Sequence, residues 1–136
     1  MRATVLTFIT ATAITLTSLP AHAADPAPAD PAVPLLKQAL AGIPGKEVLM
    51  VTVAYAPGAG TPPHRHDANT FVYVLEGSVV MQVAGGKPVT LTAGQTFYES
   101  PTDIHSVSRN ASTTQPAKIL AILVKDVDKP ATLPVK

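Results

Sequence analysis

Two histidines separated by one residue, His64 and His66, have the spacing in this chain that most directly suggests chemistry. They stand just before an aromatic and β-branched run that ends at Gly77. In a β-strand, residues i and i+2 point to the same face, so His-x-His would aim two imidazoles into one space where a metal ion could sit. The alternative is a pair of surface histidines beside a proline-rich turn.

The composition narrows both the metal chemistry and the class of partner. Cysteine is absent, which excludes disulfides and thiolate metal sites, so any metal must be held by histidine or oxygen ligands. The formal net charge is +1 and no two basic residues are adjacent, which argues against nucleic-acid binding. With 136 residues, 46% of them apolar and 4% aromatic, the chain predicts one domain with a core of Val, Leu, Ile and Ala.

The elements that must position the histidines read as short β-strands. Glycine, proline and polar turns separate apolar segments at a spacing typical of an all-β barrel or sandwich. The predicted strands are 46–56, 70–76, 78–84, 89–93, 96–100, 104–109 and 117–127. The segment 35–40 fits either one helical turn or a short edge strand, 117–127 also suits a helix, and the tail 128–136 is expected to be irregular.

The first 23 residues are expected to be a cleaved Sec-type signal peptide. Arg2 supplies a short positive region, an uncharged apolar stretch follows, and Ala21-x-Ala23 matches the small-residue cleavage pattern. A transmembrane anchor is the alternative, but the stretch is short and no basic stop-transfer cluster follows it. We therefore expect a bacterial protein that is periplasmic or secreted, with no membrane attachment after cleavage. The remaining chain would form a Pro/Ala-rich tether (24–34), one domain (35–130) and a C-terminal tail (131–136).

Two motifs resemble those of the cupins, which are small jelly-roll barrels. The first cupin motif is Gly, five residues, His-x-His, three or four residues, Glu, six residues, Gly, and it is matched by Gly58, His64, His66, Thr70 and Gly77. The second is Gly, five residues, Pro-x-Gly, two residues, His, three residues, Asn, and it is matched with shifted spacings by Gly94, Pro101, Asp103, His105 and Asn110. The resemblance to a small single-domain cupin implies an all-β, cupin-type jelly-roll β-barrel.

The resemblance also implies a divalent transition metal held by His64, His66 and His105. Thr70 replaces the usual glutamate ligand, and its neutral hydroxyl is a poor ligand. Three neutral imidazoles with open positions suit Fe, Zn, Ni, Cu or Mn, and do not suit Mg²⁺ or Ca²⁺. Loss of the carboxylate is expected to weaken hard ions such as Mn²⁺ most. The three histidines that remain after signal cleavage all fall at or beside motif positions, which supports one shared site.

Other polar residues near the motifs could complete the site or contact a substrate. Tyr98 and Glu99 alternate along one strand, so one of them points inward. Arg109 would share the face of His105 if the strand has no bulge, and could then clamp an anionic substrate; the alternative is a solvated strand end. The candidates for a fourth ligand, a supporting group or a substrate contact are Asp67, Thr70, Glu76, Gln82, Tyr98, Glu99 and Arg109. Core or cavity-wall positions are expected for Phe71, Val72, Tyr73 and Met81.

Two functions from different classes fit these residues. One is a metal-dependent enzyme acting on a small molecule, for which cupin-type dioxygenases that use three histidines without the glutamate are the analogy. The other is a non-catalytic cupin that binds a small ligand, or binds or senses a metal. The complete histidine set favours the first and the missing glutamate the second, while a structural domain with a vestigial site is a third reading. Exposed barrel edges and the apolar final strand suggest a homodimer.

Overall fold

The computed structural model describes residues 27–135, and within that range the chain is built from β-strands without any helix. The strands are β1 (Val33–Ala39), β2 (Lys46–Tyr55), β3 (Gly60–Thr61), β4 (His64–Arg65), β5 (Asn69–Glu76), β6 (Ser78–Val83), β7 (Val89–Thr92), β8 (Thr96–Glu99), β9 (His105–Asn110), β10 (Ala117–Asp126) and β11 (Leu133–Pro134). Over these residues, no helix is present that could cross a membrane. The predicted signal peptide, 1–23, lies outside the described residues.

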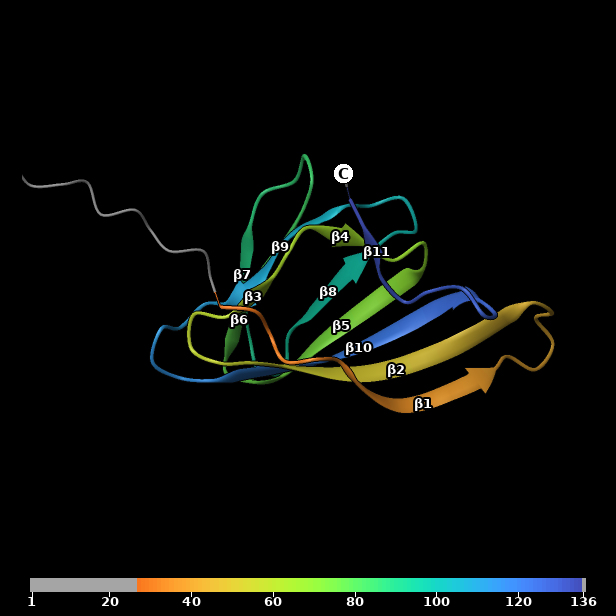
Figure 1. Ribbon diagram of the computed structural model, residues 1–136, viewed down its shortest axis with the longest axis horizontal. Coiled ribbons are helices and arrows are strands. Elements are labelled where there is room, and N and C mark those ends of the chain that lie inside the picture. Colours follow the sequence, from red (N-terminus) through yellow and green to blue (C-terminus); the bar gives the residue numbers. More distant parts are fainter. Residues whose placement is uncertain (1–26, 136) are drawn as a thin grey trace, which may run out of the picture.

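Two antiparallel sheets face each other and enclose the interior (Figure 1). One sheet has the strand order β1-β2-β10-β5-β8, and the other has the order β11-β4-β9-β6-β7 with β3 beside β9. Neighbouring strands come from distant parts of the chain, since β10 lies between β2 and β5. The predicted all-β jelly roll is confirmed, and β4 and β9, which carry His64 and His105, are neighbours in the second sheet.

Alternating apolar side chains build the core between the sheets. In β10, burial recurs at every second residue from Ala117 to Leu123, so this segment has the period of a strand and not of a helix. In β5, Thr70 and Val72 face inward, which turns Phe71 and Tyr73 outward. The expectation that Phe71 and Tyr73 line the core or cavity is therefore wrong: they are 48% and 42% exposed. The central cluster consists of Tyr55, Ala59, Val72, Val74, Val79, Met81, Ala117 and Ile119.

Both ends of the described chain are paired with the sheets. Pro28, inside the predicted tether, forms a bridge with Gly60, and β1 begins at Val33 as the edge strand of its sheet. The edge-strand reading of 35–40 is thus confirmed. The prediction of an irregular tail is wrong at Leu133–Pro134, which forms β11 beside β4. Proline lacks the backbone N–H donor but keeps its carbonyl acceptor. An edge strand such as β11 pairs with a neighbour on one side only, so a proline whose missing N–H would face solvent is tolerated there.

Candidate metal centre

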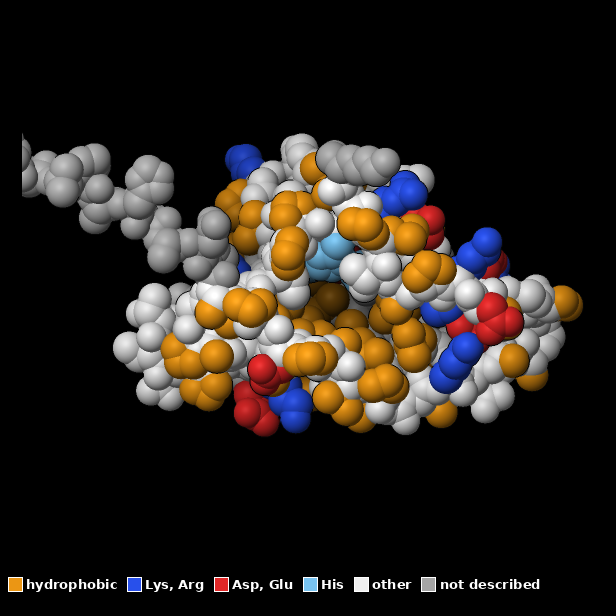
Figure 2. All heavy atoms as spheres, in the orientation of Figure 1, with side chains coloured by type: hydrophobic (Ala, Val, Ile, Leu, Met, Phe, Trp, Pro, Cys, Tyr) orange, Lys and Arg blue, Asp and Glu red, His pale blue; other side chains and the backbone are white. Residues whose placement is uncertain are grey.

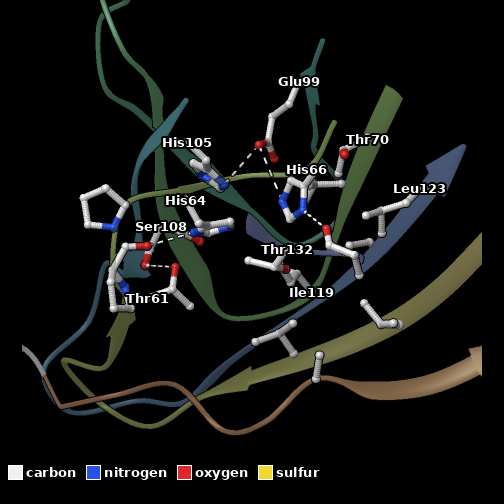
Figure 3. A pocket seen from close by; sticks show the side chains of 18 of the residues that line it. Thr61, His64, His66, Thr70, Glu99, His105, Ser108, Ile119, Leu123 and Thr132 are labelled. Atoms are coloured by element: carbon white, nitrogen blue, oxygen red, sulfur yellow. Dashed lines mark hydrogen bonds and ion pairs between the residues drawn. The ribbon is translucent and has the colours of Figure 1, made fainter. Parts of the chain in front are cut away.

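Three imidazoles, from β4, from the residue that follows β4 and from β9, meet at one point of the interior. His64 in β4 lies directly opposite His105 in β9, and His66 follows two residues after His64. One ring nitrogen of each histidine can be chosen so that all three lie within 4.8 Å of one another. The ring centroids of His64 and His66 are 4.8 Å apart, and those of His64 and His105 are 5.1 Å apart. The His-x-His pair and the distant histidine are therefore brought together as predicted, and Figure 3 shows their rings converging.

Backbone carbonyls fix the tautomers of the first two histidines. The Nδ1 atom of His64 lies 2.8 Å from the carbonyl oxygen of Pro62, and the Nδ1 atom of His66 lies 2.6 Å from that of Ala131. Because a carbonyl oxygen only accepts, Nδ1 must carry the proton in each ring, which leaves the lone pair on Nε2. Such outer hydrogen bonds orient histidine ligands and raise their basicity toward a metal.

The third histidine is buried and held neutral. His105 is 3% exposed, and neither of its ring nitrogens has a hydrogen-bond partner. Burial, with a smaller effect from His64 and His66, lowers the pKa of His105 to about 3. Burial also lowers the pKa of His66. Neutral imidazole is the form that ligates metals, so these rings are in the ligating state at neutral pH.

A buried carboxylate faces the histidines from β8. One oxygen of Glu99, Oε2, lies 3.2 Å from His105 Nδ1 and 3.8 Å from His66 Nε2, as the dashed lines in Figure 3 show. Glu99 is 2% exposed, and neither carboxylate oxygen has a hydrogen-bond partner. Burial, with a smaller effect from the charge of Asp103, raises the pKa of this carboxyl to about 7. Glu99, together with Phe97, is therefore the inward-facing choice on this strand.

Tyr98 and Arg109 do not reach the site. Tyr98 points outward, is 50% exposed and donates a hydrogen bond to Asn69 Oδ1 at 2.7 Å. In the pairing of β6 with β9, Gln82 is opposite Val107 but Val83 is opposite His105, so Ser106 is an extra residue. This bulge puts the buried Ser108 on the inward side with His105 and turns Arg109 to solvent. Arg109 is therefore a solvated strand end, which is the alternative to the anion clamp that the sequence left open. The candidates Asp67, Glu76 and Gln82 also lie outside the cavity lining.

The histidines form one end of a cavity of about 430 Å³. In Figure 2 a histidine is visible at the back of a hollow surrounded by hydrophobic side chains. Apart from the histidines, Thr70 and Glu99, the lining comprises Asp30, Ala32, Val51, Val53, Tyr55, Thr61, Pro62, Pro63, Val72, Ser108, Ile119, Ala121, Leu123, Ala131, Thr132 and Pro134. No lysine or arginine occurs among these residues, so the walls offer no fixed positive charge to the carboxylate.

Sequence reasoning missed two hydroxyls and the C-terminal wall. Tyr55 and Ser108 line the cavity, with their oxygens 2.8 Å apart. The alternation of 46–56 placed Tyr55 on one of two apolar faces, but that pattern alone does not say which face is inward. Residues 131–134 close part of the cavity and supply the carbonyl that orients His66. No local signal marked that segment.

The donor set of this site fits a divalent transition metal. Nitrogen atoms from three imidazoles and a buried, unpartnered carboxylate converge, and no lysine or arginine lines the cavity beside them. Buried charge without a partner is costly, and a cation bound among these atoms would remove that cost. Imidazole with carboxylate suits ions such as Fe, Zn, Ni, Cu and Mn.

Comparisons with known proteins agree with this architecture. A cupin domain profile matches residues 51–123, more than half of the chain. No curated protein is significantly similar. The protein TT1209 from Thermus thermophilus is 23% identical, with a TM-score of 0.56, over 72% of this chain and 84% of that chain.

Two structures of named activity are also similar. A recombinant oxalate oxidase in complex with glycolate is 26% identical, with a TM-score of 0.53, over 63% of this chain and 45% of that chain. The DMSP lyase DddQ from Ruegeria pomeroyi DSS-3 is 20% identical, with a TM-score of 0.56, over 63% of this chain and 42% of that chain. This chain thus spans less than half of either protein. The jelly roll around the histidines and the domain match together show that the chain belongs to the cupin family.

Proposed function

We propose that this protein is an exported cupin that binds one divalent transition metal at His64, His66 and His105 and presents it to a small molecule. The observation that carries the proposal is the convergence of three imidazoles at one end of an apolar cavity. When bound, the ion would supply a Lewis acid with open coordination positions. The backbone sets the tautomers of His64 and His66, because the carbonyl oxygens of Pro62 and Ala131 accept from Nδ1 and leave Nε2 free.

The cavity favours a neutral and mostly apolar ligand. Its volume of about 430 Å³ lies in the range of small-molecule sites, which is roughly 300–1,000 Å³. Valine, isoleucine and leucine side chains of β2, β5 and β10 form one wall, and the lining lacks lysine and arginine. A dianion would therefore find no partner except the metal. We propose a ligand with one nitrogen or oxygen donor and an apolar body.

Both an enzyme and a binding protein are consistent with this site. In the enzymatic version, a dioxygenase-like or related reaction would take place at the open coordination positions of the ion, beside Glu99, and the hydroxyls of Tyr55 and Ser108 bond to each other. The second candidate is a non-catalytic cupin that binds a small ligand, or binds or senses a metal. The shortage of further acid or base groups in the cavity lining favours this second candidate.

Metal content is the decisive measurement. We expect residues 24–136, purified without a metal-binding tag and loaded in turn with Fe²⁺, Zn²⁺, Ni²⁺, Cu²⁺ and Mn²⁺, to retain one ion per chain for at least one of them. Free metal at 100 times its Kd should raise the unfolding free energy by about 2.7 kcal/mol. His64→Ala and His105→Ala should abolish both effects, whereas Arg109→Ala, on the outer face, should change neither. Absence of retained metal and of any stability shift with all five ions would refute the proposal.

Two further measurements address ligand class and export. Metal-loaded protein should bind neutral apolar molecules with one oxygen donor more tightly than short dicarboxylates, and the reverse order would contradict the ligand class. When the full chain is expressed in a bacterium, the product should be found outside the cytoplasm with Ala24 as its first residue. A product that begins at Met1 would contradict export through a cleaved signal.

A further inference from the structure

The neighbour of Thr70 across the sheet carries the carboxylate that position 70 lacks. In the antiparallel pairing of β5 with β8, Thr70 lies directly opposite Glu99. Such cross-strand pairs point to the same face, with Cβ atoms roughly 4.5–5.5 Å apart. A glutamate side chain is long enough to span that offset. A carboxylate on β8 can therefore occupy the space that a glutamate on β5 would reach.

The position of the carboxylate matches that of a metal ligand. Two atoms bound to one ion at about 2.1 Å stand about 3.0 Å apart at a right angle and about 3.4 Å apart at the tetrahedral angle. Glu99 Oε2 lies 3.2 Å from His105 Nδ1 and 3.8 Å from His66 Nε2, so it is already near that separation from two of the histidines.

The chemistry of the facing atoms calls for a cation between them. His66 Nε2 carries a lone pair because Nδ1 donates to the carbonyl of Ala131. A carboxylate oxygen is also an acceptor, and two acceptors that face each other repel unless a cation or a proton lies between them. Both oxygens of Glu99 and the hydroxyl of Thr70 are buried without a partner. The described residues of the cavity lining include no lysine or arginine. They can therefore neutralise this carboxylate only by donating one proton to it.

We propose that Glu99 is a direct oxygen ligand of the metal, so that the site consists of three histidines and one glutamate delivered from the neighbouring strand. The inference rests on the proposed three-histidine metal site and extends it. Its consequence is that the replacement of glutamate by threonine in the first motif does not remove the anionic ligand. The site therefore favours hard ions such as Mn²⁺ and Fe²⁺ more than three histidines alone would.

Substitutions that remove or move the carboxylate test this assignment. Even groups one step removed from a metal are worth roughly 10- to 100-fold in affinity, so Glu99→Gln should weaken Mn²⁺ binding by at least that factor. Zn²⁺ binding, measured in parallel by chelator competition, should fall less. The exchange Thr70→Glu with Glu99→Thr should restore most of the Mn²⁺ affinity. The matched control Tyr98→Phe, at the outward-facing neighbour of Glu99 on β8, should leave the affinity unchanged.

The outcomes separate this inference from the proposed function. If the wild-type protein binds no metal, both fall; if Glu99→Gln binds Mn²⁺ as tightly as the wild type, only the role of Glu99 falls. A crystal structure of the Mn²⁺-loaded wild type decides the matter even if the variants fail to fold. A Glu99 oxygen at about 2.0–2.2 Å from the ion supports the inference. A Glu99 side chain that is hydrogen-bonded to His105 and out of reach of the ion overturns it.

Discussion

Replacement of Gly77 by alanine should destabilise the fold far more than the same change at another glycine with similar backbone geometry. Gly77 forms the tight turn that takes the chain from β5 in one sheet to β6 in the other. Its φ is +69°, and a Cβ atom there would be too close to the carbonyl oxygen of Pro116 and would lie 2.9 Å from Ala117 Cα. Both neighbours are backbone atoms, which cannot move aside as a flexible side chain could.

The magnitude follows from two separable terms. The left-handed backbone costs a residue with a Cβ about 1–2 kcal/mol. Overpacking against fixed atoms adds about 1–3 kcal/mol, which gives about 2–5 kcal/mol in total. Gly85 is the matched control, because its φ is +81° and a Cβ there would meet no atom within 4 Å. Gly85→Ala should therefore cost only the backbone term, about 1–2 kcal/mol.

Urea unfolding of the wild type and the two variants measures these free energies directly. Since domains of this size are stable by only about 5–15 kcal/mol, Gly77→Ala should leave a clearly shifted midpoint. A cost for Gly77→Ala equal to or below that of Gly85→Ala would refute the reasoning, because the close approach to Pro116 would then have no energetic effect.

Three other perturbations test separate parts of the molecule. Lys125 donates a hydrogen bond to the buried Glu47 at 2.5 Å and lowers the pKa of that carboxyl. The pair therefore stabilises the fold fully above the unfolded-state pKa of glutamate, about 4.3. This contribution is lost as the pH falls through the lower pKa of Glu47 in the folded state. Lys125→Met should therefore destabilise strongly at pH 7 and much less at pH 3 in urea unfolding; an equal effect at both pH values would contradict the pairing. The two N–H groups of the buried Asn110 amide are shared among the carbonyl oxygens of Tyr55, Ala56 and Gln115, and its Oδ1 accepts from the amide of Ser112. Asn110→Ala should therefore cost about 2–4 kcal/mol in thermal unfolding, and a cost below about 1 kcal/mol would contradict its role in holding the segment that follows β9. A chain ended at Val127 loses β11 and the carbonyl that orients His66, so it should bind Zn²⁺ roughly 10- to 100-fold more weakly, whereas unchanged affinity would show that this carbonyl is dispensable.

The strands and turns could be predicted from the sequence because they depend on local backbone geometry. A period of two along a strand and glycines at positive φ are properties of a few adjacent residues, so the strands and the turn at Gly77 follow from the pattern itself. The same period puts His64 and His66 on one side. Cupin motif spacing then predicts His105 as their partner, and the structure brings the three rings together.

The register of a strand, and the face of the sheet to which each side chain points, depend on pairing between distant segments. The alternation of residues along one strand therefore does not predict them. The alternation of side chains along a strand predicts that Tyr98 and Glu99 point to opposite faces. Only the pairing of β8 with β5 turns Glu99 toward the histidines. One extra residue at Ser106 reverses the face of Arg109, because a shift of one position in a strand moves a side chain to the other side.

His64 and His66 show which properties of the site come from the sequence and which come from the tertiary structure. Sequence alone determined that two imidazoles share one face and that a third lies in a second motif, because these are matters of spacing and family resemblance. Tertiary structure decided which nitrogens are free and which carboxylate faces them. The carbonyl of Ala131 and the side chain of Glu99 come from segments that no spacing rule links to His66, and only the pairing of β11 with β4 and of β8 with β5 places them beside it.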